Sequence, residues 1–376
     1  MGIATLMIVG AYASKNPNYN VARSHHTPGG FRNLYSEQYP RGFWKWKRDQ
    51  WRDGLPKTPE GGYHFPLLKP DTPYLAANRT DTTLTWIGHA TLLLQIKGVN
   101  ILTDPHFSER ASPVVFAGPK RVVAAALTIE ELPPIDWVAI SHNHYDHLDA
   151  ASVIKLNKRA NGKTLFLVPL GLKRWFNARK IDNVIELDWW DERTELRLKI
   201  AFTPMQHWSK RTLWDTNQAL WGSWLFKAEN FKFIFIADSG YSKNFAEIFS
   251  RYGAMDFAAV PIGHYEPRWF MKMQHANPPE ALQMVQDLHA TQAVGIHWGT
   301  FENLTDESLD DPPKLLATAL SQAKLPPEKL AVMTHGETRK LAPHEFLGRR
   351  ATKQYPCGFP SLVGWRPLCA RALAWH

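Results

Sequence analysis

Four side chains of the kinds that bind metal ions stand within one short segment: His142, His144, Asp146 and His147. They follow directly on the apolar run 137–140, which is typical of a buried strand. Side chains two residues apart in an extended segment project to the same side, so His142 and His144 can face one ion. His147 breaks this alternation, and together with Asp146 it can face a second ion. Packing does not explain such a cluster, and we predict a metal site with two ions.

One loop cannot complete two such sites, because zinc takes about four nitrogen or oxygen ligands in a near-tetrahedral arrangement. The missing ligands should be histidines or aspartates at the ends of other strands. Three residues meet this description: His207 after the apolar segment 199–203, Asp238 after 231–237, and His297 after 293–296. We predict that these three residues complete the two sites.

The elements that must position these ligands can be read from the apolar pattern. Segment 84–103 contains three short β-prone runs divided by Gly88 and Gly98, which predicts an antiparallel meander. Further strands are expected at 137–140, 164–168, 184–187, 199–202, 220–226, 231–236, 257–260 and 293–296. Helices are expected at 150–160, with Asp149 as the N-cap, and at 243–251, 278–289 and 312–323. Strands with helices between them predict an α/β body whose sheets lie in the middle.

The segment before this body has a different composition. Residues 14–80 are rich in proline, glycine, aromatic and basic residues, which rarely form long regular elements. We expect an extended arm with a short helix, packed on the main body. His25 and His26 stand side by side in this arm, and adjacent side chains of an extended segment point in opposite directions. We therefore expect them not to bind a metal ion together.

Composition narrows the class of protein only in part. The net charge of +9 over 376 residues fits a solvated basic surface, an anionic membrane or nucleic acid. Cys357 and Cys369 both lie near the end of the chain, so they cannot frame a disulfide scaffold.

No segment reaches the ~20 apolar residues of a membrane-spanning helix. Residues 1–13 resemble the second half of an export signal without its basic start. We expect a cytoplasmic protein; peripheral attachment to a membrane and export through residues 1–13 stay open.

Several longer motifs carry a resemblance to a known family. They include Trp86-Ile87-Gly88-His89-Ala90-Thr91, Ser141-His142-Asn143-His144-Tyr145-Asp146-His147, Glu186-Leu187-Asp188-Trp189-Trp190, Tyr265-Glu266-Pro267-Arg268-Trp269-Phe270 and Ile296-His297-Trp298-Gly299-Thr300-Phe301. The seven predicted ligands resemble the signature of the metallo-β-lactamase superfamily. The longer motifs are similar to N-acylphosphatidylethanolamine phospholipase D within it, over residues 16–342.

The resemblance implies a fold and a division of the chain. The fold would be a four-layer αβ/βα sandwich with the metals at one edge of its sheets. Residues 1–80 would form the N-terminal arm, 81–345 the hydrolase domain and 346–376 an irregular tail.

The resemblance also implies roles for single residues. One zinc ion would be held by His142, His144 and His207, the second by Asp146, His147 and His297, with Asp238 bridging both. Iron or manganese are the alternative metals. Asp146 and His275 would act in catalysis, and Tyr145, Gln274 and His275 would contact the substrate.

The implied reaction is hydrolysis of N-acyl phosphatidylethanolamine to N-acylethanolamine and phosphatidate. A hydroxide that bridges the two metals would attack phosphorus in line. The implied partner is a phospholipid at a membrane surface, and the family implies a homodimer. His264 departs from the family pattern, because a small residue is expected before Tyr265, and the segment after Lys353 resembles nothing in the family.

Three alternatives stay open. A fold does not determine the substrate, so another small phosphodiester or a lactone is the first of them. A nucleic-acid hydrolase is the second, although the basic residues are spread along the chain rather than clustered, and we expect no nucleic-acid partner. A non-catalytic binding protein is the third, which the full set of seven ligands disfavours.

Overall fold

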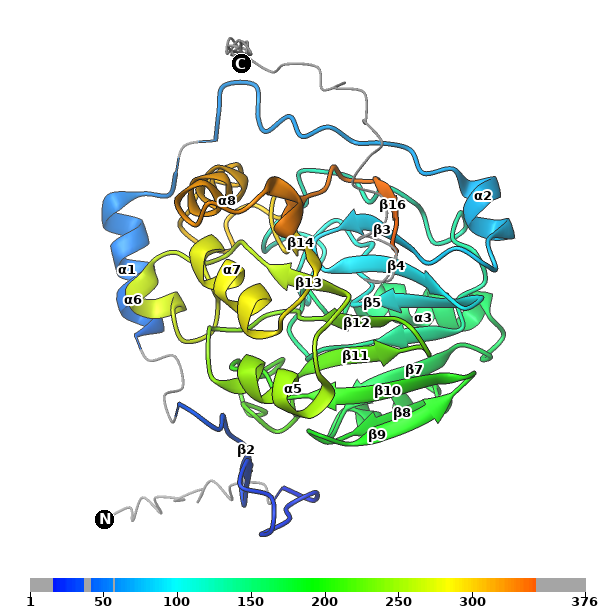
Figure 1. The fold of residues 1–376 in the computed structure, drawn as a ribbon. Helices are drawn as coiled ribbons and strands as arrows, with labels where there is room; N and C mark the ends of the chain where they lie inside the picture. The colour runs from blue at the N-terminus through cyan, green and yellow to red at the C-terminus, as the bar shows by residue number, and fades with distance from the viewer. Residues whose placement is uncertain (1–15, 37–41, 57, 343–376) are drawn as a thin grey trace, which may run out of the picture. The chain divides into compact units, whose positions relative to one another are not determined.

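Two seven-stranded sheets form the centre of the structure, a computed structural model that describes residues 16–36, 42–56 and 58–342 (Figure 1). The first sheet has the order β16-β3-β4-β5-β6-β7-β8. Its strands are β3 (Thr83–Gly88), β4 (Thr91–Ile96), β5 (Val99–Thr103), β6 (Trp137–Ala139), β7 (Leu165–Pro169), β8 (Val184–Leu187) and β16 (Thr338–Lys340). The second sheet has the order β15-β14-β13-β12-β11-β10-β9. Its strands are β9 (Glu192–Glu195), β10 (Leu198–Thr203), β11 (Ser223–Lys227), β12 (Lys232–Phe235), β13 (Phe257–Pro261), β14 (Gln292–Ile296) and β15 (Ala331–Val332).

Both sheets have the same internal pattern. In the first, β3, β4 and β5 pair antiparallel, and β5 to β8 pair parallel. In the second, β9 to β12 pair antiparallel, and β12 to β15 pair parallel. The predicted meander over 84–103 is confirmed. Segment 220–226 is a strand only from Ser223, because the N–H groups of Leu220 and Gly222 donate to the loop carbonyls of Leu170 and Ser141.

Most helices of the main body lie on the outer faces of the two sheets (Figure 1). The helices are α3 (Ala150–Arg159), α4 (Lys173–Asn177), α5 (Asn244–Tyr252), α6 (Arg268–Met271), α7 (Pro278–Asp287), α8 (Asp311–Gln322) and the 3₁₀ turn η1 (Pro327–Lys329). Of these, α6 packs against the arm, where its Phe270 and Met271 contact Trp46. Asp149 caps α3 as expected, since its carboxylate accepts from the N–H of Ala151. The short α4 and α6 were not predicted, because one turn of helix is too short to show a period.

The apolar side chains on the two faces of the first sheet belong to two different hydrophobic cores. Trp86 and Leu94 of the first sheet pack with Phe202 and Trp224 of the second, between the sheets. The alternate residues of the same strands, such as Leu93 and Val138, lie on the other face of the first sheet and pack against α3 and α4. A helix layer, two sheets and a second helix layer result, which confirms the predicted sandwich.

The N-terminal arm contains more regular structure than expected. It forms the hairpin β1 (His26–Thr27) and β2 (Gly30–Phe31), then α1 (Phe43–Asp53) and α2 (Thr72–Ala77). The prediction that the side chains of His25 and His26 diverge is wrong. Both Nε2 atoms reach Asp188, His25 at 2.6 Å from Oδ1 and His26 at 2.9 Å from Oδ2, because the chain turns here instead of running extended.

Two of the expectations for the chain ends fall outside the described residues: the export-signal segment 1–13 and the irregular tail 346–376. Within the described ranges, the helices are all too short or too polar to cross a bilayer.

Candidate metal centre

Three imidazole nitrogens meet at the edge of the two sheets. His142 Nε2 lies 2.9 Å from His144 Nδ1, and His207 Nε2 lies 3.2 Å from the same atom. Asp238 Oδ2 is 3.8 Å from His142 Nε2 and 3.7 Å from His207 Nε2. The loop after β6 supplies the first two residues, and the ends of β10 and β12 supply the others. These four side chains form a group that could hold one metal ion.

A second group lies beside the first. His147 Nε2 and His297 Nε2 are 3.0 Å apart, and Asp146 Oδ2 lies 3.3 Å from each. Asp238 also reaches this group, with Oδ1 2.9 Å from His297 and Oδ2 3.1 Å from His147. Asp238 is therefore placed to contact ions in both groups. The structure brings together all seven residues that the sequence pointed to.

The donor set fits metal ions rather than a network of ordinary hydrogen bonds. Ligands of a tetrahedral ion at 2.0–2.1 Å are separated by roughly 3.3 Å, close to the spacings found here. Burial lowers the pKa of His144 to about 3 and that of His207 to about 4, so both rings are neutral, as metal ligands must be. Burial lowers the pKa of His147 as well, but Asp238 and Asp146 raise it well above the ordinary value. These carboxylates favour positive charge at that point, which is the charge a metal ion brings.

Outer partners hold the ligand rings in place. His147 Nδ1 donates to Asp104 Oδ2 at 2.7 Å, and the Ser141 hydroxyl donates to the same carboxylate at 2.6 Å. His207 Nδ1 donates to the carbonyl of Gln274 at 2.9 Å. In His147 and His207, the hydrogen bond at Nδ1 orients the ring so that the opposite nitrogen, Nε2, faces the metal site, which is the usual role of such partners.

Two buried histidines near the second group were missed as site residues. His89 Nε2 lies 3.0 Å from Asp146 Oδ2, and His89 belongs with Asp146, His147 and His297 to a group that could hold an ion. The signal was present, because His89 is a polar residue at the end of an apolar strand. The ring centroids of His264 and His297 lie 4.3 Å apart in an edge-on contact, and the backbone of His264 is left-handed with φ of 64°. His264 thus fills space beside the metal group where a small residue was expected.

The three residues expected to contact the substrate, His275, Gln274 and Tyr145, lie in different positions relative to the metal ligands. His275 Nδ1 lies 4.0 Å from Asp238 Oδ2, and the residue is partly exposed. The Gln274 side chain is buried and donates to the carbonyl of Phe270 at 3.3 Å, so only its backbone faces the metal ligands. Tyr145 points away from them, since its hydroxyl donates to the carbonyl of Arg211 at 2.8 Å.

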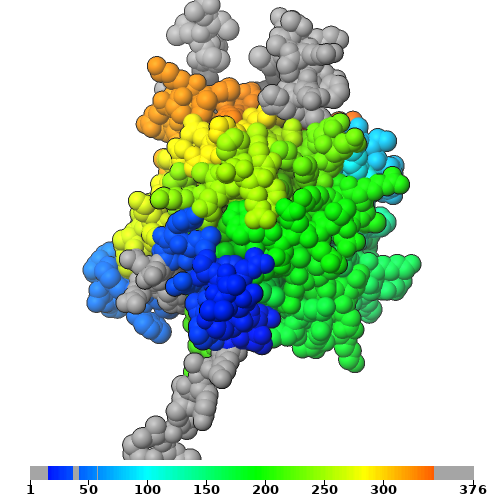
Figure 2. Space-filling model, turned by 60° about the horizontal axis from the view of Figure 1, so that its bottom comes forward, coloured from blue at the N-terminus to red at the C-terminus, as the bar shows by residue number. Residues whose placement is uncertain are grey.

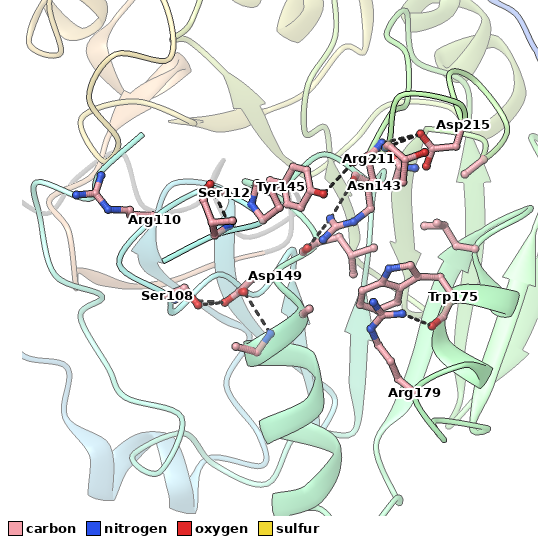
Figure 3. Close-up of a pocket in the computed structure, with 18 of the residues that line it drawn as sticks. Ser108, Arg110, Ser112, Asn143, Tyr145, Asp149, Trp175, Arg179, Arg211 and Asp215 are labelled. Atoms are coloured by element: carbon pink, nitrogen blue, oxygen red, sulfur yellow. Dashed lines mark hydrogen bonds between the residues drawn. The ribbon is translucent and has the colours of Figure 1, made fainter. Parts of the chain in front are cut away.

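Tyr145 lines a pocket of about 670 Å³ on the other face of the metal loop (Figure 3). Arg211 supports the loop from this side, donating to the carbonyls of Asn143 at 2.9 Å and Leu148 at 2.7 Å. Its guanidinium lies 4.1 Å above the ring of Tyr145. Arg110, Arg174 and Arg179 also line the pocket, and with Arg211 these arginines slightly outnumber the acidic lining residues Glu109, Asp149 and Asp215. We call it the cationic pocket.

Comparison with known proteins agrees with this geometry. Residues 99–298, more than half of the chain, match the family model described as a beta-lactamase superfamily domain. The chain is 41% identical over 238 residues to N-acyl-phosphatidylethanolamine-hydrolyzing phospholipase D 1 of Caenorhabditis elegans, covering 61% of this chain and 67% of that protein. It is 39% identical over 226 residues to the mitochondrial enzyme of the same name from Saccharomyces cerevisiae, covering 58% of this chain and 47% of that protein.

Solved structures support the fold. An isothiocyanate hydrolase from Delia radicum gut bacteria matches with a TM-score of 0.57 and 19% identity, over 69% of this chain and 99% of that one. A possible metal-dependent hydrolase from Veillonella parvula matches with a TM-score of 0.57 and 18% identity, over 70% of this chain and 100% of that one. The chain is a metal-dependent hydrolase that belongs to the metallo-β-lactamase superfamily and, within it, to the N-acyl-phosphatidylethanolamine-hydrolyzing phospholipase D family.

Proposed function

We propose that this hydrolase uses two zinc ions to cleave N-acyl phosphatidylethanolamine into N-acylethanolamine and phosphatidate. The observation that carries the proposal is the kinship with two enzymes named for this substrate. The paired ligand groups that share Asp238 support it, because a phosphodiester needs charge stabilisation at both the attacking and the leaving oxygen.

The residues have separate tasks in this reaction. His142, His144 and His207 would hold one zinc, and Asp146, His147 and His297 the other, with Asp238 shared. When bound, the two ions would supply a water of lowered pKa and offset the charge that develops on phosphorus. Asp104 keeps the His147 ring oriented through the hydrogen bond at Nδ1.

His275 is the candidate proton donor. The leaving oxygen of the N-acylethanolamine needs a proton when its bond to phosphorus breaks. The Nδ1 atom of His275 is buried 4.0 Å from Asp238 Oδ2 and has no hydrogen-bond partner among the described residues, while part of the side chain is exposed. It can therefore meet a substrate that reaches the metals. Burial lowers the pKa of His275 well below its ordinary value, and a phosphate anion bound beside the ring would raise that pKa again.

A lipid surface suits the outside of the molecule near the metal loop. Val115, Phe116, Leu213 and Trp214 are 89%, 81%, 77% and 83% exposed, which is unusual for large apolar side chains. They belong to the two loops that also contribute Val114, Val115 and Thr212 to the cationic pocket. Apolar tips beside arginines match a bilayer with anionic or zwitterionic headgroups.

The deciding experiment uses purified full-length protein and vesicles that contain N-acyl phosphatidylethanolamine. We expect release of N-acylethanolamine and phosphatidate, loss of this activity with a chelator, and recovery with added zinc. A soluble phosphodiester, a lactone, plain RNA and single-stranded DNA serve as parallel substrates. Turnover of one of these, with none of the lipid, would overturn the proposal.

A further inference from the structure

The amide of Asn33 is hydrogen-bonded to the backbone of the metal ligand His207. Asn33 Nδ2 donates to the carbonyl of His207 at 2.9 Å, and the N–H of His207 donates to Asn33 Oδ1 at 3.1 Å. One side chain thus contacts both backbone groups of one ligand residue, 174 positions further along the chain. An asparagine amide can do this because it offers a donor and an acceptor side by side.

His207 needs such support because of its place in the fold. β10 ends at Thr203, and the chain then leaves the ladder of the second sheet. An isolated bridge joins Gln206 to Gly240, so the sheet's own hydrogen bonds stop one residue before the ligand. At His207, the amide of Asn33 therefore provides the two backbone hydrogen bonds that a neighbouring strand would otherwise provide.

Asn33 is itself held from two sides. Trp221 Nε1, on a fully buried ring, donates to Asn33 Oδ1 at 3.1 Å. The hairpin before Asn33 is tied to the body, since the N–H of Phe31 donates to the carbonyl of Asn217 at 2.8 Å and the Phe31 side chain is buried. Gly30 allows this approach, because a Cβ atom there would lie 2.1 Å from the Asn217 oxygen.

The hairpin is anchored a second time at Asp188. His25 and His26 both contact its carboxylate, and Arg23 Nη2 donates to Asp191 at 3.1 Å. Figure 2 shows the result: the arm, in dark blue, lies against the green middle segment of the chain. The amide of Asn33 is therefore presented from a fixed platform rather than from a free tail.

We propose that Asn33 is a positioning residue for the first metal group. It fixes the backbone of His207, so that Nε2 of the ring converges with His142 and His144. The carbonyl of Gln274 fixes the other end of the same ring. Loss of the Asn33 amide frees the backbone of His207 and weakens metal binding at this group by about 10- to 100-fold, the range for partners of metal ligands. The second group, which lacks His207, keeps its affinity.

The test measures metal binding and needs no substrate, so it stands apart from the lipid activity. Asn33→Ala removes both hydrogen bonds, and Asn33→Asp keeps the acceptor but loses the donor. Arg32→Ala is the matched control, because Arg32 is exposed and its Nε donates within the arm, to the carbonyl of Ser24. Each protein is titrated with Zn²⁺ against a competing chelator, and the cobalt form is examined by visible absorption.

We expect two tight sites in the wild type and in Arg32→Ala. Both Asn33 variants should keep one tight site and show one weakened at least 10-fold, with an altered cobalt spectrum. Two tight sites and an unchanged spectrum in both Asn33 variants would overturn the proposal, and so would equal weakening of both sites. If Asn33→Ala does not fold, the near-isosteric Asn33→Asp decides.

Discussion

At the scale of single residues, Asp238 is the side chain that joins the two metal groups. Its Oδ1 lies 2.9 Å from His297, and its Oδ2 lies between 3.1 and 3.8 Å from His147, His207 and His142. Burial raises the pKa of Asp238, but the neighbouring imidazoles of His147, His297 and His275 lower it well below the ordinary value. The residue is therefore an anion, as a shared ligand must be.

The first prediction concerns this shared position. Asp238→Asn keeps the shape but removes the charge that both ions would use. We expect turnover to fall about 10³-fold, which corresponds to about 4 kcal/mol of barrier, together with a loss of bound metal. Steady-state kinetics and elemental analysis check this. Tyr145→Phe, on the opposite face of the same loop, should keep its metal. A fully active Asp238→Asn protein would contradict the assigned site.

The second prediction concerns proton delivery. His275→Gln keeps a polar side chain beside Asp238 but cannot transfer a proton. Its kcat should fall by about 10²- to 10³-fold, a usual contribution of general acid catalysis, while the metal content stays at the wild-type value. Kinetics combined with metal analysis separate these effects. An unchanged kcat would mean that another group protonates the leaving alcohol.

At the scale of elements, the ends of strands supply the metal ligands and the arm supplies the support behind them. His144 follows β6, His207 follows β10, Asp238 follows β12 and His297 follows β14. The hairpin β1–β2 is held by Asp188, the residue that directly follows β8. The ligand at the end of β10 thus depends on an element from the start of the chain.

The third prediction is a pH dependence of this anchor. Burial raises the pKa of Asp188, but hydrogen bonds and charge from His25 and His26 lower it below its ordinary value of 3.8. A lowered pKa of an acid stabilises the fold at every pH above the ordinary value, and the stabilisation is lost as the pH falls through the lower folded value. Denaturant unfolding from pH 6 down to pH 2 should show this loss. In Asp188→Asn, stability at pH 6 should be lower and this part of the acid dependence absent; an identical curve would argue against the anchor.

At the scale of the whole molecule, the metal loop lies between the ligand groups on one face and the cationic pocket on the other. The sandwich buries the ligands almost fully, since His142, His147 and His297 are 0% exposed. The apolar tips of two neighbouring loops, by contrast, lie in water. This division suits an enzyme that meets its substrate at a surface.

The fourth prediction tests that surface. In Phe116→Ser with Trp214→Ser, two exposed apolar side chains are lost, each worth about 1.5–3 kcal/mol when fully buried. Vesicle binding should weaken by at least about 10-fold, and hydrolysis of lipid in vesicles should fall with it. Turnover of lipid dispersed in detergent micelles should change little. Leu196→Ser is the control, because Leu196 is 56% exposed but lies in the turn between β9 and β10, at the end of β10 away from His207. Equal loss in the control would remove the support for a docking surface.

Much of the fold followed from local pattern. Short β-prone runs divided by Gly88 and Gly98 predicted the meander of β3 to β5, and the cap at Asp149 predicted the start of α3. The one-turn helices and β9 were not predicted, because β9 has a polar, half-exposed sequence with no apolar alternation. The N-terminal hairpin was missed because strands of two residues are too short to show a period.

The sequence by itself determined which residues could bind metal. The spacing from His142 to His147 and the polar residues at strand ends are local features, because each depends only on how its own segment leaves the sheet. The tertiary structure alone decided the partners across the chain: His89 beside Asp146, Asp104 behind His147, and Asn33 behind His207. It also turned Tyr145 away from the metals and His25 and His26 toward one carboxylate. These contacts join residues that are far apart in the chain, and the order of strands in the two sheets, together with the packing of the arm on the body, brings them together.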